Sequence, residues 1–260
     1  MSTLKRMTCS FFAAAAMAGV GVFGPTGAHA TDVYDAAVQH SGRSADDVKR
    51  DALDHPAEVL RLARIKPGMH VVDFLAGDGY YSELLSYVVG PGGHVLLLNN
   101  PSFSKWSEGG DVKRVADKRL PNVESQIVDL NQLQWPAASL DAVFLVKIYH
   151  DLYWVDPKGD WPKVNTSAVL DNIARAVKPG GVVVIVDHSA KPGAGTTVAS
   201  SLHRIDEGYA RKDWESRGLK LIGKSDALRK PEDPREQISY LPPMLGKTDR
   251  FVLVFRKSAS

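Results

Sequence analysis

The chain has 260 residues, of which 44% are hydrophobic, and it carries 32 basic and 30 acidic residues. Lys5 and Arg6 account for the formal net charge of +2, so the rest of the chain is neutral and lacks the basic excess with which proteins bind nucleic acids or anionic membranes. The one cysteine, Cys9, lies in the same opening segment, which excludes disulfides and thiolate metal sites from the rest of the chain.

Residues 1–30 have the pattern of an export signal. The two basic residues are followed by an apolar stretch over 11–23 and then by Ala28-His29-Ala30, a small-residue cleavage site. The apolar stretch is shorter than a membrane-spanning helix requires. We therefore expect cleavage after Ala30, a mature chain of residues 31–260 that is periplasmic or secreted, and no stable membrane insertion once the signal is removed.

Helical and strand-like patterns alternate through the mature chain. Its first helix is expected over residues 46–65, with Pro56 in a helix-opening position and Pro67-Gly68 closing the segment. Strands are expected at 69–75, 93–98, 123–128, 140–147, 181–187 and 249–256. Helices are expected between most of them, at 80–89, 110–119, 164–178 and 201–217.

Several of the expected strands are continuous apolar runs, such as VLLL, AVFLV and VVVIV. Such runs are typical of strands buried on both faces of a parallel sheet. Together with the alternation, they predict an α/β fold with a doubly wound sheet in a single domain over 31–260. Residues 151–163 and 226–248, which are rich in proline or tryptophan, are expected to be loops near a site.

Polar residues gather where the expected strands end, which is the edge of an open α/β sheet at which ligands bind. Asp73 ends the first strand, and a Gly77-Asp78-Gly79 turn leads into a helix whose first N–H groups can face a ligand. The ends of the later strands carry further polar side chains: Asn99, Asn100, Asp129, Lys147, Tyr149, His150, Asp151, Asp187 and His188. This pattern favours a cofactor site, although a strand-to-helix connection without a ligand would have the same turn.

The chain resembles class I S-adenosylmethionine-dependent methyltransferases, and more narrowly an exported bacterial branch of them. The resemblance covers nearly all of the mature chain. The segments that carry it are RDALDHPAEVLRLARIKPGMHVVDFLAGDGYYSELL, IYHDLY, VKPGGVVVIVDHSAKPGAG, LHRIDE and TDRFVLVFRK. They are specific to the branch and do not identify a substrate.

The resemblance implies a Rossmann-like, mostly parallel sheet of seven strands with the last strand antiparallel. It implies S-adenosylmethionine as methyl donor, lying over the first loop with its amino-acid end near Asp73 and Gly77, and a small molecule as methyl acceptor. On this basis we expect the donor-binding residues to be Asp73, Ala76, Gly77, Gly79, Tyr80, Asn99 and Asp129. Among these, the end of the second strand would meet the ribose and Asp129 the adenine.

Two positions depart from the usual pattern of these methyltransferases. Leu75 stands where the first glycine of the loop is usual, and a side chain there crowds the approach to the donor; the exported branch commonly has a bulky residue at this point. Asn99 stands where an acid is usual, and an amide holds a diol less strongly than a carboxylate does. Alternatively, Asn99 and Asn100 only form the turn before Pro101.

His150, Asp151 and His188 are the catalytic candidates. Methyl transfer from a sulfonium needs alignment, and it needs a base near neutral pKa if the acceptor must lose a proton. Histidine suits that role. The alternative for the first pair is structural, with Asp151 capping a helix and His150 packing against an aromatic neighbour. Aromatic side chains near the expected pocket suit a small, partly apolar acceptor.

The sequence also offers a metal hypothesis. His203 and Asp206 would share a face of a helix, and His188 could join them from the fifth strand, giving ligands that suit zinc, manganese or iron. A structural hydrogen-bond network around the HRID segment is the alternative. Because no dense ligand motif is present, we assign no metal.

Two functions follow from these patterns. The first is an S-adenosylmethionine-dependent methyltransferase acting on an unidentified small molecule. The second is a non-catalytic periplasmic ligand-binding protein on a methyltransferase fold. The export signal, Leu75 and Asn99 favour the second, because the donor is made in the cytoplasm, whereas Asp73, Gly77, Gly79 and Asp129 favour the first.

Overall fold

The computed structural model describes residues 32–156 and 158–259, and Asp32–Ser260 form one compact unit. The expected signal and its cleavage site lie outside the described residues. Within the described part of the chain, none of the helices combines the length and the apolar character that crossing a membrane requires.

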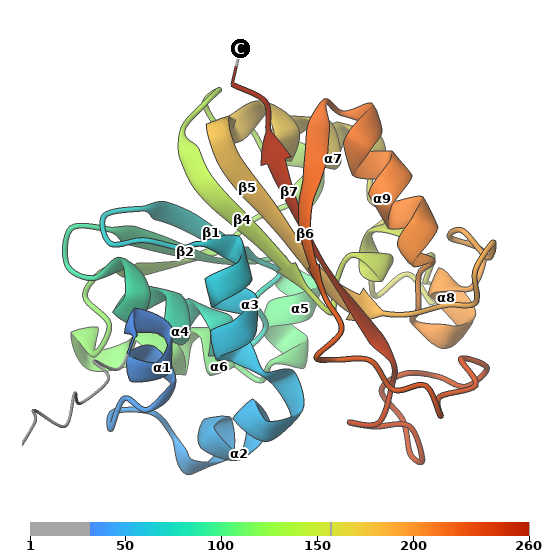
Figure 1. The fold of residues 1–260 in the computed structure, drawn as a ribbon, viewed down its shortest axis with the longest axis horizontal. Coiled ribbons are helices and arrows are strands. Elements are labelled where there is room, and N and C mark those ends of the chain that lie inside the picture. Colours follow the sequence, from blue (N-terminus) through green and yellow to red (C-terminus); the bar gives the residue numbers. More distant parts are fainter. Residues whose placement is uncertain (1–31, 157, 260) are drawn as a thin grey trace, which may run out of the picture. The chain divides into compact units, whose positions relative to one another are not determined.

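A seven-stranded sheet forms the centre of this unit, with the strand order β3-β2-β1-β4-β5-β7-β6 (Figure 1). All neighbouring pairs are parallel except those of β7, which is antiparallel to both β5 and β6. The strands are β1 (His70–Phe74), β2 (His94–Asn99), β3 (Val123–Ile127), β4 (Leu140–Val146), β5 (Val177–His188), β6 (Leu219–Ser225) and β7 (Arg250–Lys257). The predicted doubly wound fold, with an antiparallel last strand, is confirmed.

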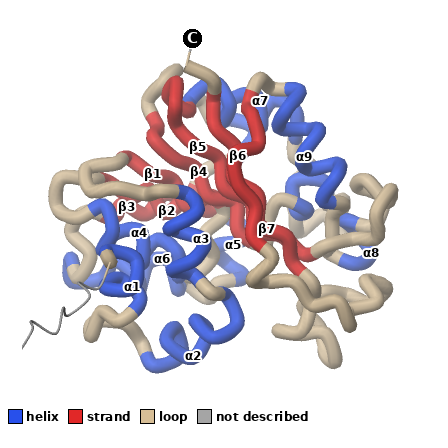
Figure 2. The backbone as a smooth tube through the Cα atoms, in the orientation of Figure 1, coloured by secondary structure: helices blue, strands red, loops and turns tan. Residues whose placement is uncertain are grey.

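Helices cover both faces of the sheet (Figure 2). A hydrophobic core lies under each set. On one face α1 (Val33–Val38), α3 (Pro56–Ala63) and α4 (Tyr80–Val89) bury residues such as Leu60 and Leu84 against the strands. On the other face α7 (Thr166–Ala176) and α9 (Glu207–Ser216) bury Ile173 and Trp214. Strands with apolar residues on both faces therefore lie between two cores, as the continuous apolar runs predicted.

The strand order reverses direction next to β1, which has β2 on one side and β4 on the other. The segments that leave β1 and β4 therefore turn to opposite faces of the sheet, and in such folds the ligand lies outside the carboxyl ends of these strands. The loop after β1 and the residues after β4 are thus placed at the position where doubly wound folds bind ligands.

The expected helix over 46–65 is two helices, α2 (Ala45–Asp54) and α3. His55 separates them in a left-handed conformation with φ 42°, because the residue before a proline is disfavoured in the right-handed helix and Pro56 then starts α3. The break turns α2 away from α3 and leaves Asp54 at its C-terminus, which matters for the site.

Two other expectations on helices and strands were wrong. The expected helix over 201–217 is α8 (Ala199–Leu202) and α9, separated at His203, whose φ is 49°. The strand β6 was not among the six expected from the apolar runs, because alternate residues along it are exposed. Short helices α5 (Pro101–Trp106) and α6 (Gly110–Val115) with the 3₁₀ turn η1 (Ala116–Lys118) follow β2.

The loops expected at 151–163 and 226–248 lie beyond the carboxyl edge. The first begins as a 3₁₀ turn, η3 (His150–Tyr153). The second contains no helix or strand among its residues and joins β6 to β7. A further short turn, η2 (Leu130–Gln132), follows β3.

Candidate active site at the carboxyl edge of the sheet

The loop after β1 has the backbone that the sequence predicted. Gly77 and Gly79 have φ 61° and 81°, and Leu75 has φ 53°, which a leucine adopts only under strain. Asp73 at the end of β1 is buried, and its Oδ2 accepts a hydrogen bond from the Ser82 hydroxyl at 2.7 Å. Burial raises the pKa of Asp73 to about 6, since the hydrogen bonds from Ser82 only partly offset the loss of water.

Leu75 points into the protein and not over the loop. Its side chain is buried in the core that lies under α7 and α9, beside residues of β1 and β2. The left-handed conformation at this position is thus retained without glycine, and the leucine is accommodated by packing.

Asn99 holds the loop after β1 in place through hydrogen bonds to the backbone of Gly77. Its Oδ1 accepts a hydrogen bond from the Gly77 N–H at 3.0 Å, and its Nδ2 donates to the Gly77 carbonyl at 2.9 Å and to Asp111 Oδ2 at 3.1 Å. Both amide hydrogens are therefore used within the protein, and the side chain is fully buried. Asn99 fixes the turn that would bind a donor, and its expected contact with the donor ribose stays a prediction.

The helix α5 lies against the same turn. Asn100 caps it, accepting a hydrogen bond from the Phe103 N–H at 2.7 Å. The stacked rings of Phe103 and Trp106 pack over Gly77, at 3.6 Å and 3.8 Å from the point where a Cβ on that glycine would lie. Among the described residues, the Nδ2 of Asn100 is buried without a hydrogen-bond partner.

The other expected donor-binding residues differ in their surroundings. Ala76 is partly exposed, and Gly79 is held close to Leu97, with no room for a side chain. The Tyr80 hydroxyl donates a hydrogen bond to Asp51 of α2 at 2.6 Å. Asp129 is exposed and caps η2 by accepting from the Asn131 N–H. Their roles toward a donor stay predictions.

A cation-rich cluster closes the space between α2 and the ends of β4 and β7. The Asp54 carboxylate accepts from Arg50 Nε at 2.6 Å and from Lys147 Nζ at 3.0 Å, and it pairs with Arg250. Burial would raise the pKa of Asp54, but the three cations outweigh it and hold this pKa well below its usual range. For Lys147, burial and the nearby Arg50 lower the pKa to about 8 despite Asp54.

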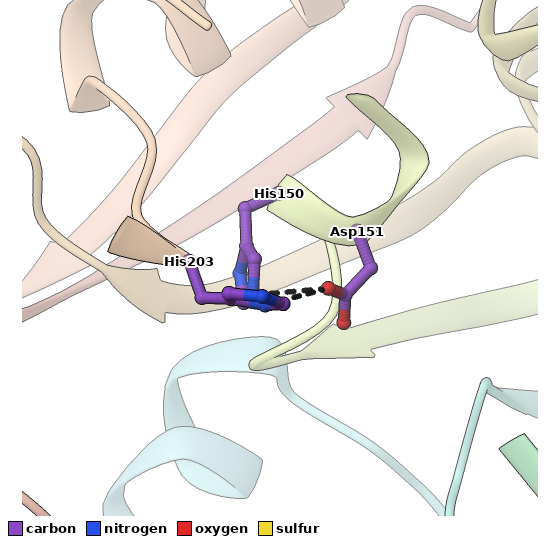
Figure 3. Close-up of side chains that lie close together, drawn as sticks. All are labelled: His150, Asp151 and His203. Atoms are coloured by element: carbon purple, nitrogen blue, oxygen red, sulfur yellow. Dashed lines mark hydrogen bonds and ion pairs between the residues drawn. The ribbon is translucent and has the colours of Figure 1, made fainter. Parts of the chain in front are cut away.

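A second cluster, rich in carboxylates, lies around His150 (Figure 3). His150 Nδ1 is 2.7 Å from Asp187 Oδ1, and its Nε2 is 3.2 Å from Asp151 Oδ1. The same Asp151 oxygen is 3.2 Å from His203 Nδ1. Three parts of the chain therefore meet here: η3 after β4, the end of β5, and the residue that ends α8.

The charges around His150 decide its protonation. Burial alone would lower its pKa, but the Asp151 and Asp187 carboxylates on either side raise it to about 10. In the neighbouring His188, burial and the positive charges of His150 and Lys147 lower the pKa well below its ordinary value. At neutral pH the first ring therefore carries a proton and the second is neutral.

The structure does not bring together His188, His203 and Asp206, the three residues of the metal hypothesis from the sequence. His203 is paired with Asp151, and Asp206 instead caps α9, accepting from the Gly208 N–H at 2.7 Å. Because the two residues lie on either side of a break between helices, they do not share a helix face as expected. His188 Nδ1 lies 2.7 Å from the Thr248 hydroxyl, and Arg204 of the HRID segment pairs with buried Asp233.

Sequence reasoning missed Asp54, Arg50 and Arg250. Asp54 and Arg250 are 196 residues apart, and no motif links them. The one signal was the placement of Arg250 at the start of an expected strand that pairs with β5, where it lies opposite His188. A surface hollow of about 590 Å³ at α3 and β6 is lined by none of the candidate residues, and we give it no role.

Comparison with known proteins agrees with the fold. Residues 72–185 match the family model described as a methyltransferase domain. This segment, which runs from β1 to β5, is therefore similar to a methyltransferase domain. Its fold is that of an S-adenosylmethionine-dependent methyltransferase from Aquifex aeolicus, with TM-score 0.56 and 20% identity over 81% of this chain and 94% of the other. A second such enzyme, from Mesorhizobium loti, has TM-score 0.51 and 16% identity over 79% of this chain and 100% of the other.

One curated relative shares more of the sequence. The ubiquinone/menaquinone biosynthesis C-methyltransferase UbiE of Ectopseudomonas mendocina is 30% identical over 166 residues, which are 61% of this chain. The chain spans 59% of the length of that relative.

S-adenosylmethionine is the cofactor of this class of domain, as predicted, and the residues at the first loop fit it. Asp73 ends β1, Gly77 and Gly79 provide a turn without side chains, and the buried Nδ2 of Asn100 offers a hydrogen bond that the described protein does not use. The rings of Phe103 and Trp106 of α5 pack beside this turn.

Proposed function

We propose that the protein is an S-adenosylmethionine-dependent methyltransferase that acts on a small molecule. The observation that carries this proposal is the loop from Asp73 to Gly79, placed at the switch point of a sheet with the strand order of this class and lying within the matched segment 72–185. Bound there, S-adenosylmethionine supplies an electrophilic methyl group. The comparisons do not favour the alternative, a non-catalytic binding protein on the same fold.

The acceptor would lie between the ends of β4 and β5. His188 would meet the acceptor as a neutral ring and a weak base, because burial and the positive charges around it lower its pKa well below the ordinary value. His150 and Asp151 would position the acceptor, since the His150 ring is fixed between the Asp151 and Asp187 carboxylates at this edge. The name of the UbiE relative places it in quinone biosynthesis, which supports a small-molecule acceptor as a class without identifying it.

We also propose that the protein belongs to an exported branch of these methyltransferases and acts in the periplasm or outside the cell. The basic, apolar and small-residue pattern over residues 1–30 supports this. A fusion of residues 1–35 to a reporter that is active only in the periplasm tests the location. Retention of the full-length protein in the cytoplasm would contradict it.

Calorimetry with S-adenosylmethionine and S-adenosylhomocysteine tests the proposed activity at its first step. We expect both to bind the mature protein with one site per chain. Failure of both to bind at millimolar concentration would overturn the methyltransferase proposal. If the donor binds but no methyl group is transferred to a panel of phenols, thiols and amines, the result would contradict the proposed small-molecule acceptor and not the donor site.

Two glycine variants locate the donor. Gly77→Ala and Gly68→Ala each force a side chain into a left-handed conformation, with φ 61° and 82°, and neither new Cβ would meet an atom closer than 3.6 Å. Each should therefore lose about 1–2 kcal/mol of unfolding free energy. Because only Gly77 lies in the donor loop, only Gly77→Ala should weaken donor binding, by at least about tenfold, or about 1.4 kcal/mol. Equal donor affinity in the two variants would place the donor elsewhere.

A further inference from the structure

The carboxylate-rich cluster around His150 has the composition and spacing of a metal site. One ligand atom each from His150, Asp151 and His203 lie within 4.8 Å of one another. Tetrahedral zinc, with bonds of about 2.0–2.2 Å, holds its ligand atoms roughly 3.4 Å apart. The two 3.2 Å separations that involve Asp151 Oδ1 are already close to this value.

Asp187 contacts His150 in the way that a second carboxylate commonly contacts a metal-binding histidine. Its Oδ1 lies 2.7 Å from His150 Nδ1 and its Oδ2 accepts from the His150 N–H at 2.8 Å. The ring is thereby fixed with Nε2 turned toward Asp151 and His203. Metal-binding histidines commonly have a carboxylate on the nitrogen that does not bind the metal.

The charge of the cluster also favours a dication. Asp151 and Asp187 are both buried, and their two negative charges face a single imidazole ring at hydrogen-bond distance. A proton on His150 compensates only one of them, whereas a divalent ion bound to neutral imidazoles compensates both. His203 has a left-handed backbone, a strained conformation of the kind that concentrates at functional sites.

We propose that His150 Nε2, Asp151 and His203 bind a divalent transition-metal ion of the zinc or iron(II) class, with Asp187 as the supporting carboxylate. Two imidazoles and one carboxylate suit these ions better than magnesium or calcium. Three protein ligands leave a position for a water molecule or a substrate oxygen, as in catalytic and not structural zinc sites. The rings of Trp154 and Tyr240 pack against His203 and hold its imidazole in place.

In the proposed reaction the ion would bind an acceptor oxygen and lower its pKa. This last step rests on the proposed function. The metal site itself does not, because it is tested without donor or acceptor, so that its failure and the failure of methyl transfer can be told apart.

The test uses the mature protein, stripped of metal by a chelator. Zn²⁺ titrated in a calorimeter should bind with one ion per chain, and Co²⁺ should give the visible absorption of a four- or five-coordinate site. His203→Ala should lose the Co²⁺ spectrum and weaken Zn²⁺ binding by at least about tenfold, and Asp187→Asn should weaken it by about 10–100-fold. His94→Gln, which alters a half-exposed histidine at the start of β2, should change neither measurement.

Several outcomes would overturn the proposal. They are the absence of stoichiometric Zn²⁺ binding by the wild-type protein, a Co²⁺ spectrum that persists in His203→Ala, and a spectrum lost in His94→Gln. If His203→Ala does not fold, His203→Gln in the same assay decides, because glutamine retains most of the volume. A spectrum lost in His188→Ala but kept in His203→Gln would favour a different ligand set and count against this one.

Discussion

Two buried charge clusters lie at the same edge of the sheet and are built in opposite senses. In one, a single carboxylate, Asp54, is surrounded by Arg50, Lys147 and Arg250. In the other, a single imidazole, His150, lies between Asp151 and Asp187. They are neighbours, because Lys147 and His150 both follow β4, and Arg250 is paired with the residue after Asp187.

The sign of the excess charge indicates which cluster stabilises the structure and which one can bind a cation. The first cluster joins α2 to β4 and β7 through the ion pairs of Asp54 with three cations. The second leaves negative charge in excess around a ring whose partners come from three parts of the chain. A surplus of buried negative charge is costly unless a cation compensates it, so the second cluster is the one that suits a ligand.

The largest expected effect comes from the first cluster. Asp54→Asn keeps the shape of the side chain and removes its charge, leaving three cations close together without the carboxylate between them. We expect a loss of about 3–5 kcal/mol of unfolding free energy at neutral pH, measured by urea unfolding. The folded-state pKa of Asp54 is lowered, so the wild-type protein should lose this contribution as the pH falls below the ordinary carboxyl range.

Asp46→Asn is the control for Asp54→Asn. Asp46 lies on the same helix, and its side chain is 92% exposed beside Lys49. Its substitution should change stability by less than about 1 kcal/mol. Equal losses of unfolding free energy in Asp54→Asn and Asp46→Asn would show that the buried carboxylate stabilises the protein no more than the exposed one.

Asp73 sharpens the comparison, because it is a third buried carboxylate at this edge and has no cation in contact. Its pKa is raised to about 6, mainly by burial. The unfolded chain therefore loses its proton before the folded chain does, and Asp73 lowers stability as the pH rises from about 4 to 6. Asp73→Asn should be equal to wild type below pH ~4 and more stable by about 3 kcal/mol at pH ~8.

The same variant should lose donor affinity, since Asp73 is the acid expected at the amino-acid end of the donor. Stability gained together with binding lost is typical of a residue retained for function. Denaturant unfolding at several pH values and donor calorimetry measure the two effects. A variant that is less stable than wild type at pH ~8 would mean that the carboxylate is ionised and compensated in the folded protein.

The donor side of the edge could be predicted from the sequence because it is local. The loop from Asp73 to Gly79 is one contiguous stretch, and α4 has the bounds expected because Gly79 starts it and Gly90 ends it. Asn99 could be placed at the end of β2, but its three hydrogen bonds to the loop and to Asp111 depend on a side-chain orientation that no spacing predicts.

The histidine side could be predicted only in part because it is assembled over long distances. His150, Asp151 and Asp187 were expected at one edge, since they follow neighbouring parallel strands. His203 was expected on a helix with Asp206, and the left-handed residue that turns it toward Asp151 has no signal in the sequence. The helix break at His55 places Asp54 at the end of α2, where it contacts Lys147. This break was missed because residues 46–65 were predicted to form one helix.

The smallest expected effect tests whether the cation-rich cluster has more positive charge than it needs. Lys147→Met removes one cation and leaves Asp54 paired with Arg50 and Arg250. Because burial and Arg50 lower the pKa of Lys147 to about 8, its charge is costly in the folded protein at pH ~7, although its hydrogen bond to Asp54 offsets part of this. We expect Lys147→Met to be as stable as wild type or more stable by about 1 kcal/mol at pH ~7.

As the pH rises from about 8 to 10, the unfolded chain keeps a proton that folded Lys147 releases, so wild type should gain stability relative to the variant. Urea unfolding of both proteins across this range measures the difference. A loss in Lys147→Met as large as that in Asp54→Asn would show that every cation of the cluster is required, and the contrast between the two clusters would then rest on the carboxylates around His150 alone.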